Sequence, residues 1–187
     1  MKEFESLIKK QLAKLGINPE TEGLEETPER FLKAFGEFTE FHRNKKKIDR
    51  HFVFFPIRSG DQLVVISGIF FSSLCEHHLL PFFGSVDIGY VPNGKILGIS
   101  KFKRILEVMT KQITVQERLT QDIFDLFMGR LEPKGLIVHI KATHTCALVR
   151  GARDTNSIFN TFVKSGFFDK HASMLVTFLH MVDKNES

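Results

Sequence analysis

The sequence predicts an α+β fold in which the strands form an antiparallel sheet. Strand character begins near residues 63–66 and returns at 86–90, where apolar side chains cluster or alternate. Two amphipathic helical patterns follow between residues 100 and 131, and strand patterns resume from residue 136. Helices grouped between runs of strands are typical of α+β proteins.

The N-terminal part is expected to be helical and separate from the main domain. Apolar residues from Phe4 to Leu15 recur close to the helical period, and Gly16–Pro19 ends the run. A second helix is expected from Thr27. Its apolar face would consist of Phe31, Leu32, Phe35 and Phe38. The basic run at 43–47 has no period and is interpreted as a solvated connector. We therefore expect a helical segment over residues 1–50 and one domain over residues 51–187.

The strands of the domain are predicted from apolar alternation and from turn residues. Val86, Ile88 and Tyr90 alternate before the turn Pro92–Gly94. After a second turn at 132–135, a long strand is expected from residue 136 to about residue 150. Another strand is expected over 158–163.

Three helices are predicted within the domain. The first is expected to begin at Ser100. The second is expected near Thr114, where the spacing of Thr114 and Glu117 indicates a capping box. A last helix is expected around residues 175–179. Their apolar positions recur at helical spacing, which places one face of each helix against a core.

Composition and charge argue for a globular protein and against some classes of partner. Hydrophobic residues make up 42% and charged residues 26% of the 187-residue chain, which is ordinary for a globular protein. No apolar run approaches the ~20 residues that span a bilayer, and no signal peptide is visible, so we expect no membrane partner and a cytoplasmic location. The net charge of +4 suits an anionic partner. Aromatic residues are not interleaved with basic ones, so we expect no nucleic-acid partner.

The two cysteines carry the first chemical signal. Cys75 has His77 and His78 within three residues, a spacing from which a loop can chelate a metal. Alone, this pattern is better explained by a loop with incidental histidines. Cys146 has His144 two residues before it, on the same face of the expected strand. Because both cysteines have a nearby histidine, we expect a zinc site.

This ligand set predicts a catalytic site and not a structural one. The chain has no second C-x-x-C or H-x-x-x-H pair to close a zinc finger. Two cysteines and one histidine leave a fourth position for water. The remaining histidines are then available as proton donors and acceptors. The residues alone leave open which of His77, His78 and His144 binds the metal.

Two further segments have both a structural and a functional interpretation. Ser100, Lys101 and Arg104 lie in the first turn of an expected helix, where backbone N–H groups favour an anion. Arg150, on the expected strand face of His144, would add a phosphate contact. Judged locally, Ser100 as a plain N-cap beside solvated basic residues is favoured. Glu117 is likewise favoured as a capping-box residue, with recognition of a base such as guanine as the alternative.

Taken together, these segments resemble the GTP cyclohydrolase I family. The resemblance covers roughly residues 20–168. It is carried by Ser73–Phe82, by Gly98–Lys101 with Arg104, by Val115–Thr120, and by His144–Cys146 with Arg150–Gly151. Gly23–Leu24 and Thr27–Arg30 also resemble the entry to the family's N-terminal helix.

The resemblance implies a fold, a reaction and a set of site residues. The family has the tunnelling fold, an antiparallel sheet backed by two helices, and it assembles as a homodecamer with active sites between subunits. It hydrolyses and rearranges GTP to 7,8-dihydroneopterin triphosphate and formate. By position, Cys75, His78 and Cys146 would bind Zn²⁺, and His77 and His144 would be the acid/base residues. Ser100, Lys101, Arg104 and Arg150 would hold the triphosphate, and Gln116 and Glu117 the guanine.

Two other classes remain as alternatives. One is a related tunnelling-fold enzyme that acts on another purine or pterin, which turnover of a substrate other than GTP would identify. The other is a non-enzymatic zinc protein or nucleic-acid binder, which a metal with four protein ligands or salt-sensitive nucleic-acid binding would identify.

Overall fold

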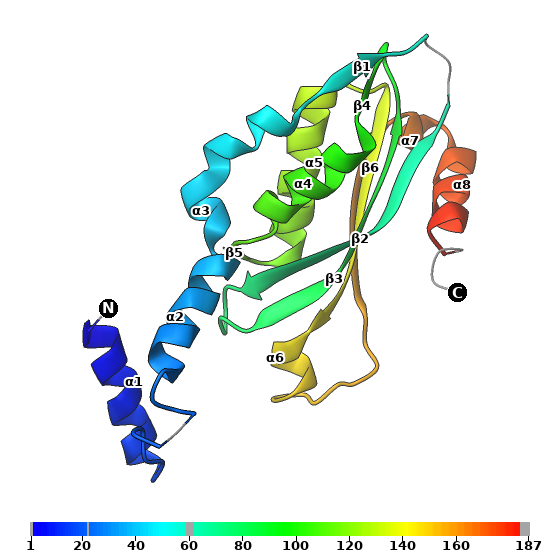
Figure 1. Ribbon diagram of the computed structural model, residues 1–187. Helices are drawn as coiled ribbons and strands as arrows, with labels where there is room; N and C mark the ends of the chain where they lie inside the picture. Colours follow the sequence, from blue (N-terminus) through cyan, green and yellow to red (C-terminus); the bar gives the residue numbers. More distant parts are fainter. Residues whose placement is uncertain (1, 22, 59–61, 184–187) are drawn as a thin grey trace.

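The computed structural model describes residues 2–21, 23–58 and 62–183 (Figure 1). The N-terminal elements are α1 (Lys2–Lys14), α2 (Thr27–Phe38), α3 (Glu40–Asn44), η1 (Lys45–Lys47) and η2 (Asp49–His51). The strands are β1 (Phe54–Pro56), β2 (Val64–Cys75), β3 (Pro81–Val91), β4 (Lys95–Leu97), β5 (Ile113–Thr114), β6 (Gly135–His144) and β7 (Phe159–Gly166). The remaining helices are α4 (Ile99–Met109), α5 (Gln116–Leu131), α6 (Thr145–Leu148), α7 (Phe167–Lys170) and α8 (Ala172–Asp183).

The main sheet has five strands in the order β5-β2-β3-β6-β7. All neighbouring pairs are antiparallel except the two-residue pairing of β5 with β2. A separate two-stranded sheet joins β1 and β4. The α+β class with an antiparallel sheet is therefore confirmed. The two helices between the strand groups, α4 and α5, lie together on one face of the sheet (Figure 1).

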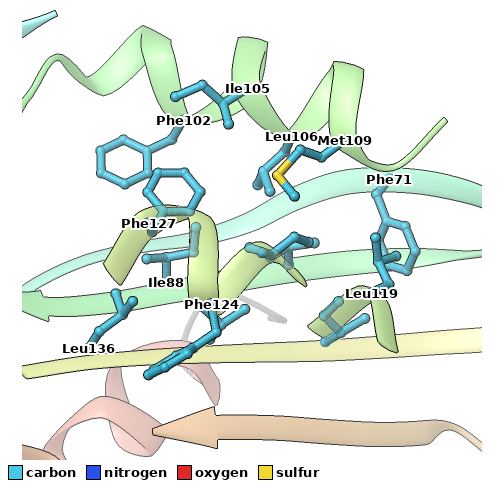
Figure 2. Packing of buried hydrophobic residues seen from close by; sticks show 14 of the residues in the cluster. Phe71, Ile88, Phe102, Ile105, Leu106, Met109, Leu119, Phe124, Phe127 and Leu136 are labelled. Carbon is cyan, nitrogen blue, oxygen red and sulfur yellow. The ribbon is translucent and has the colours of Figure 1, made fainter. Parts of the chain in front are cut away.

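The core lies between the sheet and these two helices. Phe102 of α4 stacks on Phe127 of α5, with ring centroids 5.3 Å apart, and both rings are fully buried. Ile88 of β3 and Leu136 of β6 enter the same cluster from the sheet (Figure 2). The alternation of β3 produces this arrangement, because every second side chain of a strand faces the same side. The core thereby holds the start of α5 and the ends of β2 and β6 in fixed positions.

The opposite face of the sheet is covered only in part. Phe178 and Val182 of α8 pack with Ile137 of β6 and with Phe168. The C-terminal helix expected around residues 175–179 is therefore present and longer than expected. Within the described residues, no helix is long and apolar enough to cross a membrane.

The N-terminal helices form a hairpin beside the main body (Figure 1). Phe4 of α1 stacks on Phe31 of α2 at 5.6 Å between ring centroids. The segment at 43–47, interpreted as a solvated connector, is helical, because α3 and η1 run through it. The lysines of η1 are exposed as expected, whereas Ile48 next to them is buried in the core.

The strand expected to continue to about residue 150 ends at His144. His144 pairs with Phe82, near the start of β3, so the neighbouring strand offers little further pairing. The chain turns into α6 instead, and the Thr145 hydroxyl donates to the carbonyl oxygen of Pro81 at 2.6 Å. His144 and Cys146 therefore do not share a strand face, and that expectation is wrong.

The expected capping box at the start of α5 is also absent. The helix begins at Gln116 with Val115 as N-cap, and no side chain caps it. Thr114 belongs to β5, and its hydroxyl donates to the carbonyl oxygen of Val115. At α4 the N-cap is Gly98, so the interpretation of Ser100 as N-cap is wrong as well. Both corrections leave Ser100 and Glu117 without a capping role.

We expect Gly84→Ala to destabilise the sheet strongly. A Cβ at residue 84 would meet the backbone carbonyl oxygen of Lys141, which cannot move without separating β3 from β6. Overpacking of this kind typically costs about 1–3 kcal/mol or more. Thermal or urea unfolding measures the change in the free energy of unfolding.

Gly129→Ala provides the matched control in α5. Nothing lies within 4 Å of a Cβ built at that position, so alanine is expected to stabilise the helix by about 0.5–1 kcal/mol. Equal stability of the two alanine variants would contradict this account of the close strand pairing.

Candidate metal centre and catalytic cavity

A cavity of about 460 Å³ opens where β2, β6, α5 and α6 meet. Most of the residues expected to carry chemistry line it. The lining consists of Cys75, His77, His78, Val115, Gln116, Glu117, Ala142, Thr143, His144, Cys146, Ala147, Asp154, Ser157, Ile158 and Phe159. Residues from four separate segments of the chain therefore meet in one place.

Three side chains in this cavity form a group that could hold a metal ion. One ligand atom each from Cys75, His78 and Cys146 lie within 4.8 Å of one another. Cys75 ends β2, and a turn follows in which Leu79 adopts a left-handed conformation with φ of 54°. The backbone N–H groups of His78 and Leu79 both donate to the Cys75 carbonyl oxygen, which closes the turn.

The donor set suits zinc. Thiolate and imidazole ligands select Zn²⁺ over Mg²⁺ or Ca²⁺. Burial raises the pKa of Cys146, and the adjacent Cys75 raises it further. A divalent cation reverses this effect, because it favours the thiolate form. Within the described residues this is the only group of three such donors.

His144 sits beside the metal group in a well-defined orientation. Its ring stacks on Phe82 with centroids 4.7 Å apart and an interplanar angle of 5°. The edge of Phe159 approaches the same ring. Burial lowers the pKa of His144, and Glu117 opposes that shift. Burial therefore favours the neutral form of the imidazole.

A hydrogen bond from Gln116 helps to fix the orientation of the His144 ring. Its side chain is fully buried, and its Oε1 lies 2.9 Å from His144 Nε2. The two N–H groups of the Gln116 amide share three acceptors, which are the carbonyl oxygens of Ile140 and Phe159 and the Thr161 hydroxyl. These donor contacts assign the oxygen to the side facing His144. The ring nitrogen Nε2 must then carry the proton, and Nδ1 has the free lone pair.

Two threonines complete the support of Gln116. The Thr120 hydroxyl donates to the Gln116 carbonyl oxygen at 2.8 Å. The hydroxyls of Thr120 and Thr161 are 2.7 Å apart, so Thr161 donates to Thr120. No buried side-chain nitrogen or oxygen atom of the described residues lacks a partner. These hydrogen bonds hold the Gln116 side chain in its orientation towards His144.

The histidine turn is tied to α5 by an ion pair. Arg118 Nη1 lies 2.5 Å from Glu76 Oε2, and this hydrogen bond lowers the pKa of the Glu76 carboxyl. His77 is exposed at the mouth of the cavity, with Nδ1 3.7 Å from Cys75 Sγ. Glu117 is also exposed and lines the cavity. Acid, base and metal-ligand groups therefore surround one space.

The residues expected to bind phosphate are not part of this cavity. Ser100, Lys101 and Arg104 lie on α4, and none of them lines it. Arg150 follows α6, where its charge acts on Cys146 but its side chain is exposed. Among the described lining residues there is no lysine or arginine.

Sequence reasoning missed the residues that hold His144 in place. Phe82 and Thr161 belong to strands with ordinary alternation, so their side chains carried no chemical signal. The pairing of Thr161 with Ile140 across β7 and β6 brings the threonine to Gln116. Only the register of the sheet could have revealed this contact.

Comparison with known proteins agrees with this geometry. The family model of GTP cyclohydrolase I matches residues 4–183. The chain belongs to the GTP cyclohydrolase I family. The matched range contains both cysteines, the three histidines of the cavity and α4, and so extends well beyond the segments that first suggested the resemblance.

Curated relatives support the same assignment. GTP cyclohydrolase 1 of Chlorobium chlorochromatii is 40% identical over 182 residues, covering 97% of this chain and 81% of the relative. The Coxiella burnetii enzyme of the same name is 40% identical over 179 residues, covering 95% of this chain and 96% of the relative. The Campylobacter jejuni subsp. doylei enzyme is 38% identical over 183 residues, covering 97% of this chain and 95% of the relative. Membership of this family assigns GTP cyclohydrolase activity to the chain.

Among solved structures, an archaeosine synthase QueF-Like in the apo form is similar to the chain. The TM-score is 0.47 at 20% identity, and the match covers 58% of this chain and 97% of that one.

Proposed function

We propose that the chain uses the Cys75–His78–Cys146 group with zinc to convert GTP to 7,8-dihydroneopterin triphosphate and formate. One observation carries the proposal: this group shares a cavity with His144 and Glu117. In this reaction water adds to C8 of guanine, the imidazole ring opens, and formate leaves. The ribose carbons then rearrange and close the new ring. Zinc bound to these three residues supplies Lewis-acid chemistry.

The protein residues have distinct roles in this proposal. His144 accepts a proton at Nδ1, because Nε2–H is engaged with Gln116 and the neutral ring is favoured by burial. His77, exposed at the cavity mouth, exchanges protons with the leaving and attacking groups. The Glu117 carboxylate accepts hydrogen bonds from the N–H edge of guanine. The Glu76–Arg118 ion pair holds the turn that carries His77 and His78.

The lack of basic residues in the catalytic cavity supports an active site that is completed by a neighbouring copy of the chain. A triphosphate carries several negative charges, yet no lysine or arginine is among the described lining residues. The basic residues of α4 would therefore reach the substrate from a neighbouring copy, and Arg150 from the edge of the same cavity. We propose a homo-oligomer, a decamer by resemblance to the family. The cytoplasmic location expected from the sequence stays a prediction.

GTP turnover by the purified, metal-analysed protein tests this function. We expect formate and the pterin absorbance to appear in equal amounts, to disappear on chelation, and to return with zinc. Zinc-loaded oligomer that releases neither product from GTP would contradict the proposal. Turnover of another purine instead would identify a related enzyme.

A further inference from the structure

Three polar residues, Asp87, His139 and Asn160, form a connected group outside the catalytic cavity. Asp87 of β3 and His139 of β6 are buried, with 1% and 7% of their surfaces exposed. His139 Nδ1 lies 3.1 Å from Asp87 Oδ2, and His139 Nε2 lies 3.2 Å from Asn160 Oδ1. None of the three is among the described residues that line the catalytic cavity, so the proposed reaction leaves this group without a role.

The group lies on the side of the sheet that faces away from α4 and α5. The residues on either side of Asp87 in β3, and those on either side of His139 in β6, belong to the core beneath these helices. Because side chains alternate along a strand, Asp87 and His139 point to the opposite face. Asp87 Oδ1 also accepts a hydrogen bond from the backbone N–H of Gly68 at 2.8 Å, where the pairing of β2 with β3 is irregular.

The hydrogen-bond partners indicate that the His139 ring carries a proton on both nitrogens. Asn160 Nδ2 donates to the carbonyl oxygen of Ile158 at 3.1 Å, which assigns Oδ1 to the side of His139. An amide oxygen only accepts, so His139 Nε2 must donate to it. The ionised carboxylate of Asp87 also only accepts, so Nδ1 donates as well. The resulting imidazolium is paired with Asp87, and hydrogen bonds from a charged donor are stronger than neutral ones.

Asn160 connects this group to the residues that support His144. Its two neighbours in β7 both accept hydrogen bonds from Gln116 Nε2. The Phe159 carbonyl oxygen does so at 3.0 Å and the Thr161 hydroxyl at 3.1 Å. The ring of Phe159 also meets the ring of His144, with centroids 5.6 Å apart. One face of this short stretch of β7 therefore contacts the histidine pair partner Asn160 provides, and the other face contacts Gln116.

The start of β7 has few other contacts to hold it. β7 is an edge strand that pairs only with β6, and this pairing begins at Phe159. Residues 149–158, which precede it, run without helix or strand. Strand ends beside such segments open locally at little cost in free energy. A hydrogen bond from the charged His139 ring to Asn160 opposes this opening.

We propose that Asp87, His139 and Asn160 form a positioning network for His144. His139 holds Asn160, Asn160 fixes the start of β7, and β7 fixes Gln116. Gln116 in turn sets the proton of His144 on Nε2. The effect of the network on turnover rests on the proposed function, whereas its effect on the His144 ring does not depend on any substrate.

Steady-state kinetics and solid-state ¹⁵N NMR of histidine-labelled, zinc-loaded protein test the proposal. Asn160→Ala is expected to lower kcat by about threefold to thirtyfold, with zinc content and the KM for GTP close to wild type. The His144 signals, assigned by their loss in His144→Ala, should show a proton on Nε2 in the wild type and a mixture of both tautomers in Asn160→Ala. A purely structural role of Asn160 would lower the melting temperature without changing the tautomer.

Two further variants serve as controls. In Asn160→Asp the carboxylate still accepts from His139 Nε2 but cannot donate to Ile158, so most of the lost kcat should return. Asn93 is an exposed asparagine that likewise donates to a backbone carbonyl oxygen, that of Glu132, outside the network. Asn93→Ala should therefore behave as wild type in both measurements.

Asp87→Asn tests the charge of the network. The amide can still accept from the Gly68 N–H but presents its own N–H group to His139 Nδ1. The ring should then be neutral, with one proton on Nε2 and two well-separated nitrogen signals. In the wild type the two His139 signals should be nearly equal, as in an imidazolium, and separated signals there would overturn the charged pair.

Other results would overturn the positioning role. An unchanged kcat or an unchanged His144 tautomer in Asn160→Ala would do so. Asn160→Asp as slow as Asn160→Ala would also do so, because the effect would then belong to the Ile158 contact. If the wild type turns over no GTP, the proposed function fails, whereas the His144 nitrogen signals still decide whether the network positions the ring.

Discussion

Cys146→Ser is expected to remove zinc binding and to reduce GTP turnover on the order of a thousandfold or more. The serine hydroxyl stays protonated near neutral pH and is a poor zinc ligand, so Cys75 and His78 alone would remain. Zinc content by metal analysis and formate release by the same sample measure both effects. The fold should survive, because Cys146 lies at the edge of the core.

The nearby Val149→Ser variant is the control for this substitution. Val149 directly follows α6, is 65% exposed and does not line the cavity, so zinc content and turnover should stay at the wild-type level. Full turnover by zinc-free Cys146→Ser would show that the reaction does not use this metal group.

The first half of the metal site could be predicted from local sequence. Cys75 and His78 are three residues apart, and a single turn brings such residues together regardless of the rest of the fold. The choice between His77 and His78 could not be made in this way, because both lie in the same turn. The geometry favours His78, because one of its ring nitrogens lies within 4.8 Å of the sulfurs of both Cys75 and Cys146.

The second half of the site depended on long-range structure. The sequence predicted a strand from residue 136 to about residue 150, and an apolar run does continue beyond His144, from Cys146 to Val149. A strand needs a neighbour as well as a pattern, and the pairing with β3 stops at Phe82. The resulting turn at α6, and not a shared strand face, brings Cys146 to Cys75.

The residues expected to bind phosphate show a different limit of prediction from sequence. Ser100, Lys101 and Arg104 could be identified as a basic helix start, yet the structure places them outside the catalytic cavity. Sequence alone carries no information on whether two sites of one chain serve the same substrate molecule. The proposed function links the two by charge, because no lysine or arginine is among the described residues that line the catalytic cavity.

Gln116→Met is expected to lower kcat about a hundredfold while leaving zinc content and the KM for GTP close to wild type. Methionine has a similar volume but cannot accept the proton of His144 Nε2, so the ring loses both its tautomer and its orientation. The buried carbonyl oxygens and Thr161 would also lose a donor, which costs about 1–3 kcal/mol of stability. Stopped-flow or steady-state kinetics with a parallel melting curve separates the two effects.

Gln121→Met is the matched control, because Gln121 lies on the same helix but is exposed, and its side chain donates a hydrogen bond to Asp125. It should retain wild-type kcat and stability. Separate measurement of kcat and KM in Gln116→Met distinguishes between two roles for Gln116. A raised KM with normal kcat would mean that its amide contacts guanine, as the family resemblance implied. A lowered kcat with normal KM would mean that it acts through His144, which is the role that its complete burial favours.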